Sequence, residues 1–283
     1  MKNIFTICFC LLFFQSAFSA PILEDNDIWE TAHFKIQSSF KKKDTKKFAY
    51  AIEDFAAQAE RIYSIKLSQK LSLCLFSSRK DFFKFVKQSN IREAKYAGGF
   101  FSHENNLIAV FLQHSEQEML TTLFHEIAHA YTARAFKQAP QAIHEGLSAF
   151  LESSSLRFHK IEIGLIHRRY LELFLKMLEK NTLTPLASFL NIQGYDLGKI
   201  HETFGEDQYA EAWALLYYCL RGPEDVQKKF KKYLQSLRIH PDPSGLTFLS
   251  LMVENTFQKQ WITFMQKIKP DKQDRKNKDI QFG

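Results

Sequence analysis

The residues best suited to chemistry lie in the stretch LFHEIAHA, at positions 123–130. His125 and His129 are four positions apart, so in a helix their rings project from one face, one turn apart. Two imidazoles at this spacing can bind one tetrahedral Zn²⁺. Glu126 is displaced by about 100° around the helix, where a general base can take a proton from a zinc-bound water. The stretch therefore predicts a zinc-binding helix. An ordinary amphipathic helix that carries three polar residues is the alternative.

The apolar neighbours of this stretch favour the metal. Large apolar side chains occupy a separate face of the same helix: Leu120, Leu123, Phe124, Ile127 and Tyr131. Three ionisable groups gathered on the remaining side of a largely apolar segment cost desolvation free energy unless something compensates them. A bound metal ion would compensate them.

A third protein ligand is expected on the next helix, which should begin near Gln141, after Pro140. The first helix continues about 10 Å past His129, and an antiparallel return of similar length brings Glu145 back to the level of the metal. Two histidines, one glutamate and a water make an open catalytic zinc site, so we predict one Zn²⁺ per chain. His144 is a rival ligand, although it points elsewhere on the helix.

Glu152 lies seven positions after Glu145 and therefore returns to nearly the same helical face. From there it could accept a hydrogen bond from a ligand imidazole and so orient that ring. A surface glutamate is the alternative.

The first twenty residues have the pattern of a secretory signal peptide. Lys2 precedes an almost unbroken apolar run at 4–14 and a small-residue region at 16–20. We expect cleavage after Ser19, with Ala20 as the second choice. An uncleaved anchor is the alternative, but a membrane span needs about 20 apolar residues. The sequence thus predicts a secreted or periplasmic protein with no stable membrane span after cleavage.

Composition and charge limit the classes of partner. The 283 residues are 45% hydrophobic and 14% aromatic, enough for the core of one large domain or two small ones. The net charge of +7 is spread out, and its densest cluster, 40–47, is typical of a solvated loop and first helical turn. We therefore predict no nucleic-acid partner. Cys74 and Cys219 could form a disulfide or remain two buried thiols, and nothing in the sequence indicates the oligomeric state.

Periodicity predicts an α+β fold with a small N-terminal mixed sheet and a mostly helical C-terminal half. Alternating residues predict strands at 31–37 and 71–75, and turn residues within 98–112 predict a hairpin. A helix of about twenty residues should follow a cap near Asp44 or Thr45, and a short helix should cover 82–86. After residue 114 the chain should be helical to the end, starting with a Ser115–Glu118 capping box. The later helices are expected at 115–136, from 141, and at 162–180, 208–221, 224–237 and 246–266.

Four segments follow from these patterns. We expect a signal peptide at 1–19, an α+β subdomain with a rim hairpin at 20–114, a helical zinc subdomain at 115–266, and a disordered basic tail at 267–283.

The pair of motifs, HEIAH at 125–129 and EGLSAFLE at 145–152, resembles the gluzincin zinc metallopeptidases, the clan that includes thermolysin-like enzymes and M1-type aminopeptidases. In that group the glutamate of the Glu-Gly stretch is the third zinc ligand, a role that the resemblance assigns to Glu145. The chain order is most similar to an uncharacterised secreted bacterial branch of the clan. The similarity spans about 29–265, and it implies a thermolysin-like fold with zinc between its two halves.

A further segment, 209–218, is similar to the aminopeptidase segment whose first tyrosine donates a hydrogen bond to the tetrahedral oxyanion. The resemblance assigns that role to Tyr209, and a phenol near zinc would stabilise charge that appears only in the transition state. The segment departs from the relatives at Ala212, where they have Gly. Alternatively, Tyr209 caps a buried apolar stripe.

These patterns predict a secreted zinc-dependent metallopeptidase in which Glu126 activates the water and then protonates the leaving amine. A peptide or protein substrate could pair with the rim hairpin by strand addition. Glu104-Asn105 resembles the amino-terminus reader of aminopeptidases only superficially and is better interpreted as a β-turn. The alternative function is a catalytically silent protein of the same fold, an envelope component that recognises peptides or glycans.

Overall fold

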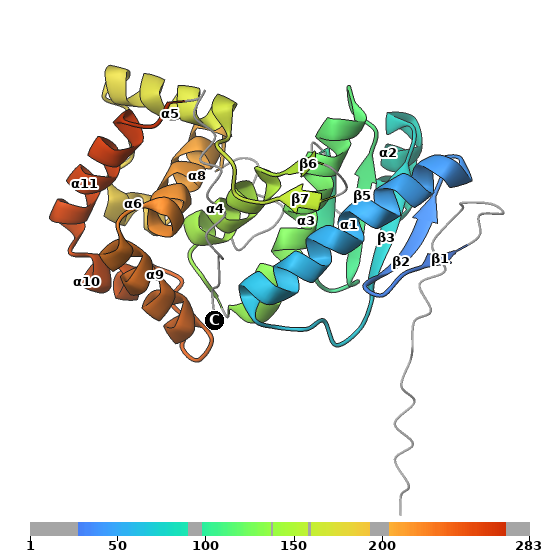
Figure 1. Ribbon diagram of the computed structural model, residues 1–283, viewed down its shortest axis with the longest axis horizontal. Coiled ribbons are helices and arrows are strands. Elements are labelled where there is room, and N and C mark those ends of the chain that lie inside the picture. The colour runs from blue at the N-terminus through green and yellow to red at the C-terminus, as the bar shows by residue number, and fades with distance from the viewer. Residues whose placement is uncertain (1–27, 90–97, 137, 158–159, 193–203, 270–283) are drawn as a thin grey trace, which may run out of the picture.

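The computed structural model describes residues 28–269 except 90–97, 137, 158–159 and 193–203. Its architecture is α+β, as predicted, with a mixed sheet near the N-terminus followed by a mostly helical half (Figure 1). The predicted signal peptide and residues 270–283 of the predicted tail lie outside the described residues. Among the described residues, no helix is long and apolar enough to cross a bilayer.

The sheet has five strands in the order β1-β2-β3-β5-β4. Its centre is parallel, and the outer strands β1 and β4 pair antiparallel with their neighbours. The predicted hairpin is formed by β4 and β5. The strand bounds are β1 Trp29–Glu30, β2 Phe34–Ser38, β3 Leu71–Phe76, β4 Gly99–Ser102 and β5 Leu107–Phe111.

The two faces of the sheet are covered by different helices, because successive side chains of a strand point to opposite faces. In β5, Ile108 and Val110 join the main core with α1 (Lys42–Tyr63) and α3 (Glu116–Ala135). Their neighbours Leu107, Ala109 and Phe111 join a smaller core with α2 (Arg79–Ser89). The helix α3 therefore lies on the α1 side of the sheet.

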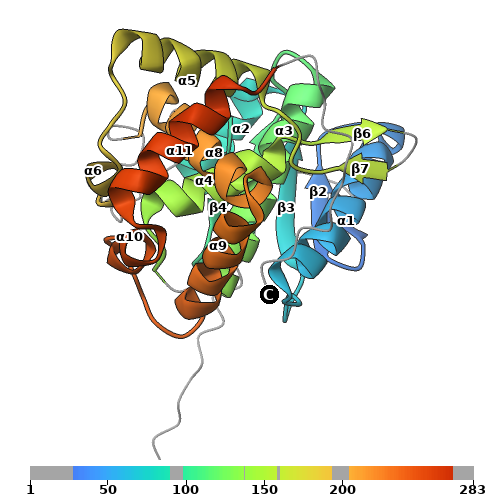
Figure 2. The same cartoon turned by 60° about the vertical axis from the view of Figure 1, so that its left-hand side comes forward.

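The helical half is built around α4 (Gln141–Glu152), which packs against both α3 and α8 (Glu206–Arg221). Around this core lie α5 (Arg168–Lys180), α6 (Leu186–Leu190), α9 (Glu224–Leu237), α10 (Leu246–Met252) and α11 (Glu254–Gln266). Figure 2 shows α11 in front of α8, which it contacts. One hydrophobic cluster extends from the sheet through α3 and α4 to these outer helices.

The contact between α4 and α8 requires a glycine. A Cβ at Gly146 would lie 2.5 Å from Cδ2 of Leu216 and 2.7 Å from the backbone oxygen of Ala212. The two helices therefore approach more closely than any side chain at this position permits. Because Glu145 precedes Gly146, the same contact fixes the predicted ligand relative to α8.

Two predicted helix starts are wrong. The first helix begins at Lys42, before the predicted cap at Asp44 or Thr45, and has no side-chain cap. The Thr45 hydroxyl donates instead to Ser38 Oγ, 2.8 Å away. The helix predicted from 162 begins at Arg168, because β6 (Ser155–Arg157) and β7 (Lys160–Glu162) form a hairpin before it. The chain after residue 114 is thus not helical throughout.

The β7 strand is held by polar side chains of α1. The backbone N–H of Ile161 donates to Asp54 Oδ2 at 2.9 Å, and Gln58 Nε2 donates to the carbonyl of Ile161 at 3.0 Å. These partners lie more than a hundred residues away in the sequence, and helical periodicity cannot reveal them.

The helix predicted at 246–266 is divided into α10 and α11 at Val253, whose φ is 55°. The first piece packs against α9, whereas the second packs against α8 and α5. One straight helix cannot follow both directions. The short helix α6 was not predicted.

Cys74 and Cys219, the two cysteines among the described residues, are free thiols and do not form a disulfide. Cys74 lies in β3 and Cys219 in α8, and both are buried. Burial raises the pKa of the Cys74 thiol to about 12.

We predict that Gly146→Ala destabilises the protein by about 1–3 kcal/mol, because the added methyl group overpacks the contact between α4 and α8. Helix propensity alone would favour alanine by about 1 kcal/mol. Urea unfolding of the metal-free protein measures the difference. The control is Ala57→Gly at an exposed position of α1, which calibrates propensity without a packing change. A stabilised Gly146→Ala variant would contradict the close contact.

Candidate metal centre

The start of α3 is fixed by Ser115, whose Oγ accepts a hydrogen bond from the backbone N–H of Glu118 at 3.1 Å. The second hydrogen bond of the predicted capping box has a different donor, one residue earlier in the chain. The Glu118 carboxylate accepts from the N–H of His114 at 3.3 Å rather than from that of Ser115. With this start, Leu123 and Ile127 are buried in the main core, while His125 and His129 point toward α4.

The helices α3 and α4 run antiparallel through the site. His125 contacts Glu152 at the end of α4, whereas His129 contacts His144 near its beginning. The antiparallel packing places Glu145 beside both histidines, as we predicted from the lengths of the two helices. Ligand atoms of His125, His129 and Glu145 all lie within 4.8 Å of one another and could hold a metal ion.

The distances suit a shared metal. Glu145 Oε2 is 3.4 Å from Nε2 of His125 and 3.3 Å from Nε2 of His129, and the two nitrogens are 2.9 Å apart. Donor atoms at about 2.05 Å from one tetrahedral zinc are separated by about 3.3 Å. Two of the three separations match this value, and the third is somewhat shorter.

The Glu145 carboxylate has one satisfied and one unsatisfied oxygen. Its Oε1 accepts a hydrogen bond from Gln141 Nε2 at 2.6 Å. Its Oε2 is buried without a hydrogen-bond partner, although the two imidazole nitrogens face it. A buried carboxylate oxygen without a partner carries a desolvation cost. A cation bound between Oε2 and the two nitrogens would remove that cost.

Each histidine also has a neighbour on its other ring nitrogen. Glu152 Oε2 lies 2.5 Å from Nδ1 of His125. Nδ1 of His129 lies 2.9 Å from Nδ1 of His144 and 3.0 Å from Ser148 Oγ. A proton held on Nδ1 leaves the Nε2 lone pair free for a metal.

His144, the rival ligand, is outside the three-residue group. Its ring stacks on that of His129, with the ring centroids 4.9 Å apart. Burial, together with the nearby charge of His129, lowers the pKa of His144 to about 3. A neutral His144 can accept the proton of His129 Nδ1, so its place is behind the ligand and not on the metal.

The charges of the site favour a cation. Burial alone would lower the pKa of His125, but Glu152 and Glu145 outweigh it and raise the pKa well above its usual value. Burial opposes the charge of Glu145, yet the two histidines hold the pKa of that carboxyl well below its usual range. Burial raises the pKa of Glu126, and the histidines partly offset this effect. Three carboxyl groups thus surround two imidazoles.

The structure also brings Glu126 and Tyr209 to the site. Glu126 follows His125 on α3, and its side chain is buried. The ring of Tyr209, at the start of α8, lies edge-on to His125 with the ring centroids 6.2 Å apart. Burial, followed by the charges of Glu145 and Glu126, raises the pKa of the Tyr209 phenol, which therefore remains a hydrogen-bond donor.

Sequence reasoning missed several neighbours of the ligands. Gln141 precedes Glu145 by four residues, so the helical i,i+4 rule could have found it. Ser148 is found only when the packing of α4 on α3 is known. His167 and Tyr170 approach Glu152 from α5, after a hairpin that the sequence did not reveal.

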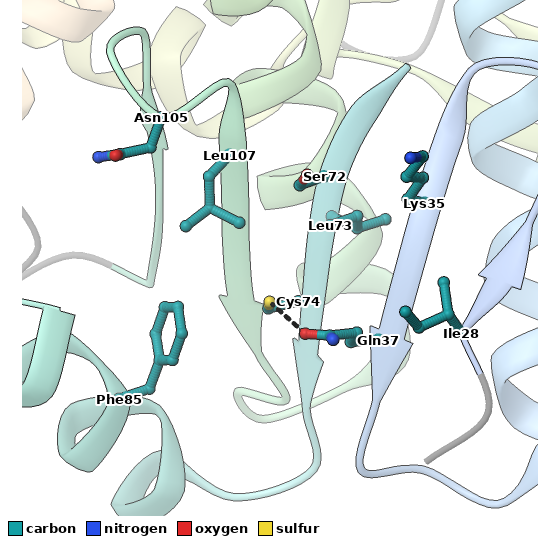
Figure 3. Close-up of a pocket in the computed structure, with 9 residues that line it drawn as sticks. All are labelled: Ile28, Lys35, Gln37, Ser72, Leu73, Cys74, Phe85, Asn105 and Leu107. Atoms are coloured by element: carbon teal, nitrogen blue, oxygen red, sulfur yellow. Dashed lines mark hydrogen bonds between the residues drawn. The ribbon is translucent and has the colours of Figure 1, made fainter. Parts of the chain in front are cut away.

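A pocket of about 170 Å³ lies elsewhere, on the sheet (Figure 3). Cys74, Phe85 and Leu107, which belong to the smaller core on the α2 side, contribute to its lining, so it is not part of the metal centre. Cys74 Sγ is 3.7 Å from Gln37 Oε1 in this pocket. The remaining lining residues are Ile28, Lys35, Gln37, Ser72, Leu73 and Asn105.

Comparison with known proteins gives one family match. Residues 119–241 match the model of a family described as a protein of unknown function, DUF1570. The match covers less than half of the chain, but it contains the three candidate ligands, with most of α3 and all of α4. No curated protein matches the chain.

We predict that Zn²⁺ stabilises the protein by about 2.7 kcal/mol when free zinc exceeds its dissociation constant a hundredfold. The thermal unfolding midpoint should rise with zinc and fall again with a chelator. His129→Ala and Glu145→Ala should each remove this rise, because each takes away a ligand.

One control should keep the rise. His33→Ala breaks a histidine–glutamate pair between the residue before β2 and α1, which involves none of the candidate ligands. A zinc-dependent rise that survives in both ligand variants would disprove the site.

Proposed function

We propose that this protein is a secreted zinc-dependent metallopeptidase of the gluzincin type. The observation that carries the proposal is the buried, unpartnered Oε2 of Glu145, which faces Nε2 of His125 and of His129. Two imidazoles and one carboxylate form a donor set that suits Zn²⁺ and leaves a fourth position open. A zinc ion there would supply a Lewis acid that polarises the substrate carbonyl and acidifies water. The signal-peptide pattern at 1–19 supports export.

Glu126 is the proposed general base. It follows His125 on α3, so the packing that orients the ligand also fixes the base. In this role its carboxylate accepts the proton of the attacking water and passes it to the leaving amine. Water and peptide thus become a carboxylic acid and an amine, with the proton carried by Glu126.

Tyr209 is the proposed donor to the oxyanion. Its ring edge meets His125, and Phe204 packs against it with the ring centroids 5.0 Å apart, which restrains the phenol. A donor held in place before reaction stabilises negative charge as it develops on the carbonyl oxygen.

The edge strand β4 is the proposed track for the peptide. It is the outer strand next to β5 and contacts α3. A Cβ at Gly99 would lie 2.9 Å from Cγ2 of Thr122, so β4 lies close to the helix about one turn before His125. An extended peptide that pairs with this edge would lie beside the metal centre.

We expect Glu126→Gln to retain zinc and to lower peptide hydrolysis by about 10²–10⁴-fold, because the amide cannot accept the proton. A diverse peptide library digested by both proteins, with zinc content measured in parallel, tests this. Glu172→Gln on the exposed face of α5 is the control. Zinc in the wild type without any cleavage would favour the silent peptide- or glycan-binding protein instead.

Tyr209→Phe should lower kcat by about 10²–10³-fold with a smaller effect on KM, because the phenol acts on the transition state. Steady-state kinetics on a peptide found in the library digest give both constants. The exposed Tyr50 of α1 supplies the matched control, Tyr50→Phe. An unchanged kcat would show that Tyr209 only caps the buried stripe of α8.

A further inference from the structure

The carboxylate of Glu152 connects the metal centre to α5. On one side, Oε2 lies 2.5 Å from Nδ1 of His125. On the other side, Oε1 lies 3.7 Å from Nε2 of His167. The Glu152 side chain is only 7% exposed, so protein groups rather than water decide its orientation. The groups that hold Glu152 therefore also act on His125.

The cap of α5 fixes which nitrogen of His167 carries the proton. His167 is the N-cap residue, and its Nδ1 accepts a hydrogen bond from the backbone N–H of Tyr170 at 3.2 Å. An accepting nitrogen has no proton, so a neutral imidazole must carry its proton on Nε2. Burial lowers the pKa of His167 and favours this neutral form. The Nε2–H dipole then points to the Glu152 carboxylate.

Tyr170 approaches the same carboxylate. Its ring stacks on the His167 ring, with the ring centroids 3.8 Å apart and the planes inclined by 16°. Burial, followed by the charge of Glu152, raises the pKa of the Tyr170 phenol, so the phenol keeps its proton. At 3.7 Å the contact of His167 with Glu152 is longer than a hydrogen bond. His167 therefore acts on Glu152 through its Nε2–H dipole, and the stacked Tyr170 ring fixes the plane of the His167 ring.

We propose that His167 and Tyr170 are positioning residues of the metal centre, which hold Glu152 so that it keeps the Nδ1 proton of His125. Nε2 of His125 then presents its lone pair to the metal. The inference rests on the metal site of the proposed function but not on peptide hydrolysis.

The series of contacts that orients His125 begins at the N-cap of α5. The N–H of Tyr170 sets the proton position in His167, and His167 and Tyr170 set the orientation of Glu152. Glu152 in turn sets the tautomer of His125. Such partners of a ligand raise its basicity and fix its ring, and their loss commonly costs about 10–100-fold in metal affinity.

Two substitutions separate this role from a structural one. Tyr170→Phe keeps the ring that stacks on His167 and removes only the hydroxyl group near Glu152. His167→Asn keeps a side-chain oxygen that can cap α5, since Asn is a favoured N-cap residue, but removes the Nε2–H. The readouts are the Zn²⁺ dissociation constant, measured by competition with a coloured chelator, and the visible spectrum of the Co²⁺-loaded protein.

We expect each variant to bind Zn²⁺ about 10–100-fold more weakly than the wild type and to shift the Co²⁺ spectrum. Tyr63→Phe is the matched control, because it removes a buried phenol that pairs with Thr132 at 2.7 Å between α1 and α3. It should leave the Zn²⁺ affinity within about twofold. In the double variant Glu152→Gln/Tyr170→Phe, the Zn²⁺ affinity should be little lower than in Glu152→Gln alone, because the carboxylate that Tyr170 helps to orient is already replaced.

Unchanged Zn²⁺ affinity in both variants, an equal loss in Tyr63→Phe, or a full further loss on the Glu152→Gln background would each overturn the inference. A wild type that binds no zinc would overturn it together with the metal site. Zinc binding with the expected losses but without peptide cleavage would overturn only the peptidase, so the two failures are distinguishable.

Discussion

The close contact of α4 with α8 at Gly146 constrains the rest of the site. Because Gly146 has no side chain, α4 can lie directly against α8 and at the same time along α3. Glu145 and Ser148 then face His129, and Glu152 faces His125. A shift of α4 by the width of a methyl group would move all of these contacts together. The geometry of the ligands is thus a property of helix packing and not of a loop.

The charges of the site oppose the stability of the fold. Glu126, Glu145 and Glu152 are all buried, and an isolated buried carboxylate is strongly unfavourable. Removal of one partner from such a cluster costs more free energy than the cluster contributes, because it leaves a charge uncompensated. A proton on His125, whose pKa the neighbouring carboxylates raise, supplies part of the compensation. A divalent cation held by His125, His129 and Glu145 would supply more positive charge in the same volume, and its binding would then be coupled to folding.

The sequence predicted the parts of this protein that depend on spacing within one helix or between two adjacent helices. The i,i+4 pair His125 and His129 is local, and Glu145 follows from the lengths of α3 and α4. The β6–β7 hairpin was missed because Asp54 and Gln58 of α1 hold it. The break at Val253 was missed because α10 and α11 pack on different neighbours. Both depend on contacts between segments far apart in the chain, which periodicity does not encode.

The edge strands of the sheet are shorter than its inner strands. Its inner strands β2, β3 and β5 have five or six residues, whereas the outer strands β1 and β4 have two and four. Unpaired N–H and C=O groups on an outer strand can recruit another chain, including a second copy of the same protein. Within the described part of the chain, the strands long enough to template such self-association are enclosed by their neighbours. The brevity of β4 thus limits aggregation through this edge of the sheet.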